Sequence, residues 1–283
     1  MTTSPLTNPE IERIFGEGES APLPASAPAS LIEEWRRFVR FVRRPYLPPH
    51  AGSSAATLTG KVTGKVTAKV TGTFRMLWLD LPLMGMLIAL LSLAAALGFE
   101  LPENINATLE FSVWTVVLVV LVAPVLEEFA FRSWLNGAPA IMVLVALCAL
   151  GLIGVPLALN VFDPGGQLPL LNLFAPLLVA LGFVAAVIMR KRPVPSPFRS
   201  WFAVFFWGSA LGFALIHLGN YSSLSWSMLA ILLPLVLPQF ALGAMLGYLR
   251  VHYGLMSAIA LHAAHNAILF ALASLGAGMS GEG

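Results

Sequence analysis

The segment APVLEEFAFR, at 123–132, places two carboxylates and one guanidinium inside an apolar stretch. On a helix, Glu128 and Arg132 are four residues apart and can form an internal ion pair. Glu127 lies about 100° around the same helix, so this pairing leaves it without an intrahelical partner. A carboxylate removed from water holds a proton more readily, which suits a general base near neutral pH. We expect Glu127 to act chemically; the alternative is a buried network of all three that only holds helices together.

Two further segments supply imidazole and amide groups. In FALIH, Phe213 lies one turn before His217 on the same helical face. A lone histidine in an apolar helix is more often a hydrogen-bonded core residue than a catalyst. In HAAHN, His262 and Asn266 are four residues apart and share a face, and His265 can share that face or lie beside it. The available chemistry is therefore carboxylate, imidazole and amide.

Taken in order, the motifs EExxxR, FxxxH and HxxxN resemble those of the CAAX prenyl protease and bacteriocin-processing family, also called the Abi family. The resemblance covers roughly residues 111–275. It implies hydrolysis of a peptide bond near the C-terminus of a membrane-associated substrate. The sequence departs from the family in one respect, because the stretch between the first two motifs is longer by about two spans.

The resemblance also implies roles for the residues that match its motifs. Glu127 and His217 would hold and deprotonate a water molecule, and His262 and Asn266 would donate hydrogen bonds to the oxyanion. His262 is preferred to His265 because it matches the first histidine of HxxxN. The supporting residues of the same motifs would orient the base or bind the substrate carboxylate; they are Glu128, Arg132 and Phe213.

Two versions of this chemistry fit the motif residues. Members of the family have been described both as metalloproteases and as glutamate-dependent enzymes. If zinc is bound, its ligands would be Glu127, His217 and His262, with water in the fourth position. The chain has no HExxH, the usual helical zinc-protease motif. We favour a mechanism without an obligatory metal.

Composition places these motifs in a membrane. Apolar residues make up 58% of the chain and charged residues 11%, whereas a soluble domain carries about a quarter charged residues. Long apolar runs predict an all-α bundle of about seven transmembrane helices. The expected spans are 81–99, 111–137, 140–159, 169–189, 201–218, 228–249 and 254–275. Nothing in the sequence indicates nucleic-acid binding.

The N-terminal eighty residues are expected to lie outside the bundle. Residues 1–30 are polar and proline-rich, which predicts a disordered cytosolic tail. Residues 31–44 read as a basic amphipathic helix, suited either to the surface of an anionic leaflet or to packing on the protein's own cytosolic face. The repeat KVTGKVTAKVTG, at 61–72, contains Gly64 and Gly72 and favours a flexible basic linker. We accordingly expect 31–80 to be a basic juxtamembrane segment and 81–275 the bundle.

Charge predicts sidedness. Of the sixteen Lys and Arg residues, ten lie at or before Arg75, and most of the others fall between the fourth and fifth spans or after the sixth. The positive-inside rule then places the N-terminus in the cytosol and the C-terminus outside. Counted along the helices from the cytosolic side, the acidic residue and both motif histidines reach similar depths, so the site would open toward the cytosol.

Ionisable residues inside a membrane have other uses. A chain of Glu and His can relay protons, so a proton-coupled transporter component is the rival interpretation. The chain shows no clear internal repeat of the kind many transporters have. A catalytically silent relative that binds other membrane proteins is a third reading. The expected partners are the bilayer and a membrane-associated peptide or protein substrate.

Overall fold

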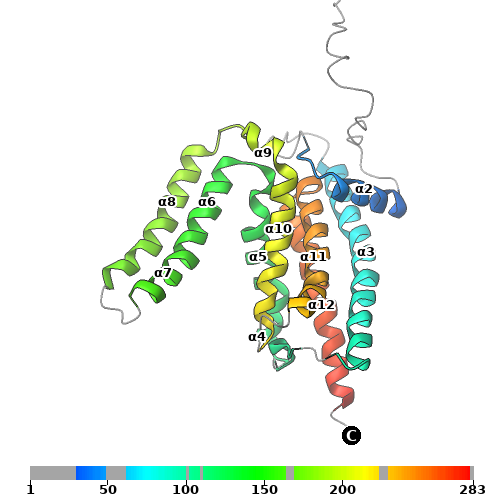
Figure 1. Ribbon diagram of the computed structural model, residues 1–283. Helices are drawn as coiled ribbons and strands as arrows, with labels where there is room; N and C mark the ends of the chain where they lie inside the picture. The colour runs from blue at the N-terminus through cyan, green and yellow to red at the C-terminus, as the bar shows by residue number, and fades with distance from the viewer. Residues whose placement is uncertain are drawn as a thin grey trace, which may run out of the picture.

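The structure is a computed structural model that describes residues 30–48, 62–99, 102–108, 111–163, 169–222 and 229–280. Within these ranges the secondary structure is helical, apart from one isolated bridge between Asn104 and Tyr221. Seven of the described helices are long and apolar enough to cross a membrane, so the expected all-α membrane bundle is confirmed (Figure 1). The expected tail at 1–30 lies almost wholly outside the described residues.

Several of the spans are built from more than one helical element. The elements, in chain order, are α2 (Leu31–Arg43), α3 (Val62–Ala96), η1 (Ile105–Thr108), α4 (Val113–Val116), η2 (Val117–Val122), α5 (Ala123–Arg132), η3 (Ser133–Asn136), α6 (Pro139–Ala149), η4 (Leu150–Gly154), α7 (Val155–Phe162), η5 (Pro169–Leu173), α8 (Phe174–Met189), α9 (Ser196–Ser200), α10 (Phe202–Ile216), η6 (His217–Asn220), α11 (Leu229–His252) and α12 (Leu255–Ser280). Of the six elements labelled η, η2 and η4 are π-helical turns, and the other four are 3₁₀ turns.

Six of the seven spans agree closely with the sequence expectation, and the first does not. The spans are Val66–Ala96, Val113–Asn136, Pro139–Phe162, Leu170–Met189, Phe202–Asn220, Pro234–His252 and Leu255–Leu275. The flexible linker expected at 61–72 is wrong, because α3 is already helical from Val62. Gly72 is not a hinge in this helix: a Cβ there would lie 2.5 Å from the ring of Tyr253. Because Gly72 has no side chain, α3 can approach the end of α11 closely at this point.

The core centres on α11. In its span, 61% of the most apolar stretch is buried within the protein, against 6% for the span that contains α8. Close packing of α11 on α10 depends on two glycines one turn apart. A Cβ on Gly243 would lie 3.3 Å from the backbone of Ala210, and a Cβ on Gly247 would lie 2.7 Å from the Phe206 ring. This GxxxG pair lets the two backbones approach.

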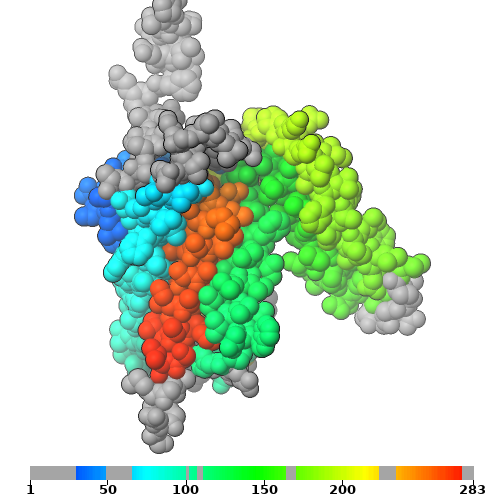
Figure 2. Space-filling model, turned by 180° about the vertical axis from the view of Figure 1, so that it is seen from behind, coloured from blue at the N-terminus to red at the C-terminus, as the bar shows by residue number. Residues whose placement is uncertain are grey.

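The third and fourth spans form a hairpin that projects from the side of the bundle (Figure 1). The helices α6 and α8 pack mainly on each other, and the space-filling view shows a hollow between this hairpin and the rest of the protein (Figure 2). The hairpin begins at Gly137, whose φ of 74° is left-handed and whose Cβ would meet Val194 and Phe198. These two spans are the additional length that separates the first two motifs. Because they extend sideways, the helices that carry the motifs still pack together.

Candidate active site

The acidic pair lies on α5, which is the second half of its span. Arg132 Nη1 donates to Glu128 Oε1 at 2.7 Å, and both side chains are fully buried. The ion pair expected from the four-residue spacing is therefore present. Glu127 lies on the next face of the helix and is partly exposed. Its Oε2 atom is buried without a hydrogen-bond partner among the described residues.

A break in helical regularity sets the start of α5. Ala123 N–H bonds Leu118 O, five residues back, which makes η2 a π-turn. Pro124 follows and has no N–H to give to the carbonyl of Val119, five residues before it. Asn266 of α12 supplies that donor instead, with Nδ2 at 2.9 Å from Val119 O. The amide expected to face the substrate thus also holds α12 against the turn before the glutamates.

Side chains from two other helices hold the C-terminal end of α5. Helix ends carry carbonyls without intrahelical partners. Arg250 of α11 donates through Nε to Arg132 O at 2.9 Å and through Nη2 to Ser133 O. Ser209 of α10 donates to Phe131 O at 2.6 Å. The sequence indicated neither role, since an arginine at the end of a span reads first as a marker of sidedness.

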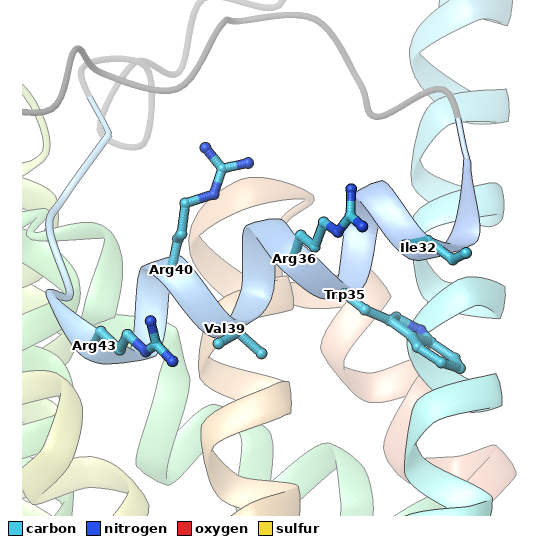
Figure 3. A pocket seen from close by; sticks show the side chains of 6 residues that line it. All are labelled: Ile32, Trp35, Arg36, Val39, Arg40 and Arg43. Carbon is cyan, nitrogen blue, oxygen red and sulfur yellow. The ribbon is translucent and has the colours of Figure 1, made fainter.

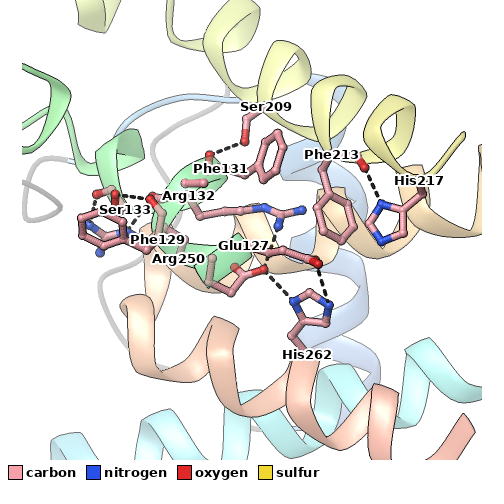
Figure 4. A network of polar contacts seen from close by, with 12 residues as sticks. Glu127, Phe129, Phe131, Arg132, Ser133, Ser209, Phe213, His217, Arg250 and His262 are labelled. Carbon is pink, nitrogen blue, oxygen red and sulfur yellow. Dashed lines mark hydrogen bonds and ion pairs between the residues drawn. The ribbon is translucent and has the colours of Figure 1, made fainter. Parts of the chain in front are cut away.

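His262 lies between the two glutamates of α5. Its Nδ1 atom is 3.0 Å from Glu128 Oε1, and its Nε2 atom is 3.6 Å from Glu127 Oε2 (Figure 4). The imidazole is buried. Because Glu128 accepts from Arg132 as a carboxylate, we assign the Nδ1 proton of His262 to the same oxygen. That hydrogen bond fixes the ring and turns Nε2 toward Glu127.

The aromatic ring of Phe213 joins the remaining parts of the site. This buried ring contacts the His217 ring at 4.6 Å and the His262 ring at 5.5 Å between centroids. The guanidinium carbon of Arg132 lies 3.8 Å from the centroid of the same ring, a cation–π contact (Figure 4). The sequence-predicted residues of α5, α10 and α12 are therefore brought together.

His217 begins the short turn η6 at the end of α10. Its Nδ1 atom lies 2.7 Å from Phe213 O, and since a carbonyl only accepts, Nδ1 carries the proton. The Nε2 atom of His217 is then the free ring nitrogen. His217 is close enough to Glu127 and His262 to interact electrostatically with both.

His265 takes part in a separate contact. Its Nδ1 atom is 2.7 Å from Asp80 Oδ2 of α3, and both side chains are buried. Of the two histidines in HAAHN, His262 is therefore the one beside the glutamates. Asp80 lies one residue before the start predicted for the first span, at 81, and was therefore not among the predicted site residues. The sequence feature that could have identified Asp80 is its position next to an apolar run, where an unpaired charge is costly and a partner is needed.

Several polar atoms of the site have no partner within the described residues. They are Glu127 Oε2, Glu128 Oε2, Arg132 Nε and Arg132 Nη2. Buried polar atoms are normally hydrogen-bonded, so their clustering indicates a place for water or a polar ligand. The cluster brings a carboxylate, two imidazoles and a guanidinium close to one another.

The donor set was also tested against a metal ion. Two imidazole nitrogens and a carboxylate are ligands that zinc accepts. In the part of the chain that the structure describes, however, no three His, Cys, Asp or Glu side chains are grouped closely enough to hold an ion. The geometry therefore does not fit a zinc ion held by Glu127, His217 and His262.

Fold and site together define a class: a multi-pass membrane protein with a buried carboxylate–imidazole site shared by three spans. The model of the family Type II CAAX prenyl endopeptidase Rce1-like matches residues 109–268, and the chain belongs to that family. The family suspected from the motifs is confirmed, and with it the class of CAAX-type intramembrane endopeptidases. Neither a curated protein nor a solved structure matches the chain.

Proposed function

We propose that this protein hydrolyses a peptide bond near the C-terminus of a membrane-associated substrate with a water activated by Glu127 and His217. One observation carries the proposal: the second, fifth and seventh spans bring a carboxylate and two imidazoles to a single, partly buried centre. Side chains this costly to place within a membrane default to a functional role.

The water would lie beside Glu127. The 3.6 Å between Glu127 Oε2 and His262 Nε2 is longer than a direct hydrogen bond, and Glu127 Oε2 has no other partner among the described residues. A water molecule beside this pair can hydrogen-bond to both atoms. Glu127 takes a proton from that water while the water oxygen attacks the carbonyl carbon, and the proton then passes to the leaving amine nitrogen. His217, whose Nδ1–H is held by Phe213 O, offers Nε2 as a second contact for the water.

The oxyanion would be stabilised by donors from α12. A proton on His262 Nε2, in addition to the Nδ1 proton directed at Glu128, would make Nε2 a donor to the oxyanion. The second N–H of the Asn266 amide is available because only one is used on Val119 O. Exclusion of bulk water strengthens both hydrogen bonds in the transition state. Arg132 Nη2, which has no hydrogen-bond partner among the described residues, would bind a substrate carboxylate.

We also propose that the site opens toward the cytosol, with the N-terminus on that side. The helices α2 and α9 lie at one end of the bundle and the C-terminus at the other (Figure 1). The basic residues of α2 and of the connection before α9 therefore gather at one end. By the positive-inside rule that end is cytosolic.

A cleavage assay in proteoliposomes tests the proposal. The full chain is reconstituted with a C-terminally lipidated peptide, and released fragments are followed by mass spectrometry. We expect cleavage by the wild type and its loss in Glu127→Ala, His217→Ala and His262→Ala. Unchanged turnover in any one variant removes that residue from the catalytic set. Proton flux without any cleavage would contradict the proposal and support the transporter reading.

A further inference from the structure

The helix α2 lies across the end of the bundle, roughly at right angles to the spans (Figure 1). Ser30 caps its first turn by accepting from Glu33 N at 3.2 Å. Its inner face is buried and includes Phe38 and Phe41, which pack into the main core. Of the two uses that the sequence left open for this helix, packing on the protein itself is present.

Two polar contacts fix the rotation of α2 about its own axis. The buried carboxylate of Glu34 accepts from the hydroxyls of Tyr248 and Tyr253, the latter at 2.6 Å. Burial, and then the hydrogen bond to Glu34, raise the pKa of the Tyr253 phenol, so it remains a donor at neutral pH. Trp35 Nε1 donates to Arg75 O of α3 at 2.9 Å. Because the inner face is held in this way, the residues of the outer face are fixed too.

The outer face of α2 combines apolar side chains with guanidinium groups along a groove of about 500 Å³. Its lining residues are Ile32, Trp35, Arg36, Val39, Arg40 and Arg43. Ile32 is 58% exposed and Val39 42% exposed. Together with the Trp35 ring, these two side chains give the groove an apolar strip next to its guanidinium groups.

The side chains on this face are sorted by direction. Arg36 and Arg40 point away from the spans, whereas Trp35 and Val39 lie on the side toward them (Figure 3). Helices that lie in a membrane interface arrange cations toward the headgroups and aromatic or aliphatic side chains toward the acyl region in this way. The helix also packs on α3 and contacts it at Arg75, nine residues after the start of the span at Val66.

We propose that the outer face of α2 is a binding site for anionic phospholipid headgroups of the leaflet at this end of the bundle. Arg36, Arg40 and Arg43 supply the charge complementarity, and Ile32 and Val39 contact the upper acyl chains. Three cations on one short face are attracted electrostatically to a negatively charged leaflet, and a neutral leaflet offers no such attraction. The site is separate from the peptidase centre and does not depend on the proposed reaction.

Lipid titration of the purified full chain, followed by native mass spectrometry, tests this site. The probes are phosphatidylglycerol, phosphatidylcholine and inorganic phosphate. The test variant is Arg36→Gln/Arg40→Gln/Arg43→Gln, and the matched control is Arg190→Gln/Lys191→Gln/Arg192→Gln, which removes three cations at the same end of the bundle. Each cation near an anionic surface strengthens binding about fivefold, so the test variant should lose about a hundredfold in phosphatidylglycerol affinity.

The control triple should keep its affinity, and Arg→Lys changes at the same three positions of α2 should retain most of it, since the charge remains. Thermal unfolding of every variant checks that the fold is intact. If the Gln triple does not fold, the Lys triple replaces it in the test, and its affinity for phosphatidylglycerol should fall when salt screens the cations. The proposal is overturned if the Gln triple binds phosphatidylglycerol like the wild type, or if the control triple loses as much. Equal binding of phosphatidylcholine, or equal competition by inorganic phosphate, also overturns it.

Discussion

His262 of α12 and Glu127 of α5 face each other across 3.6 Å, although they are separated by 135 positions in the chain. On its other side, the His262 ring is held by the Glu128 carboxylate, which Arg132 also binds. One glutamate thus orients the imidazole, and the other is left with a buried oxygen that has no partner among the described residues. This division of roles between adjacent glutamates is the basis of the proposed chemistry.

The two histidines of HAAHN should respond differently to substitution. We expect His262→Ala to abolish peptide cleavage with little more than a modest loss of stability. His265→Ala removes the hydrogen-bond partner that the buried Asp80 carboxylate has among the described residues. It should therefore lower the free energy of unfolding by about 3 kcal/mol while leaving cleavage by the folded fraction intact. Denaturant titration and cleavage rates normalised to folded protein measure the two effects. Loss of cleavage in both variants to the same extent would show that the distinction is wrong.

Asn266 and Pro124 should be energetically coupled. Asn266→Ala leaves Val119 O without its donor, at a cost of about 1–3 kcal/mol in unfolding free energy. In a Pro124→Ala background, residue 124 regains an N–H that the neighbouring carbonyls can accept, so the same change should cost less. A double-mutant cycle measured by unfolding titration gives the coupling energy. Additive effects of the two changes would contradict the proposed link.

The close crossing of α10 and α11 predicts a contrast between two glycines. Gly247→Ala forces a methyl group against the buried Phe206 ring, and overpacking of this kind costs about 1–3 kcal/mol. Gly208 has nothing within 4 Å of its would-be Cβ, so Gly208→Ala should be neutral or slightly stabilising, as alanine is the better helix former. Melting temperatures of the two variants compare them directly. Equal destabilisation would mean that α11 does not owe its position to Gly247.

Long apolar runs made most of the bundle predictable from sequence, and the ion pair of Glu128 with Arg132 followed from helical spacing alone. The start of α3 was mispredicted because alternating Val, Thr and Lys with two glycines reads as a linker. The structure places Gly72 against Tyr253 instead, a tertiary contact that no local pattern reveals. Local propensity was overridden by packing.

The contacts that position the site could not be predicted from the sequence either. Arg250 and Ser209 support the carbonyl end of α5 from two other helices, and this role depends on which helices are neighbours. The sequence feature associated with the π-turn of η2 is Pro124. A proline can equally produce a simple kink, so it does not predict the π-turn. Asp80 could have been found by asking which partner a charge beside a span requires.

The cleavage rate of Glu127→Gln tests the central claim most directly. Glutamine keeps the size and the polar tip of Glu127 but cannot take a proton from water, so the fold and substrate binding should persist. General base catalysis contributes about 10²–10⁴-fold to rate. In reconstituted full-length protein with a lipidated peptide, we expect kcat to fall by about that factor with KM nearly unchanged. A kcat within a factor of about two of the wild type would contradict the assignment of Glu127 as the base, since an effect that small is far below what a general base supplies.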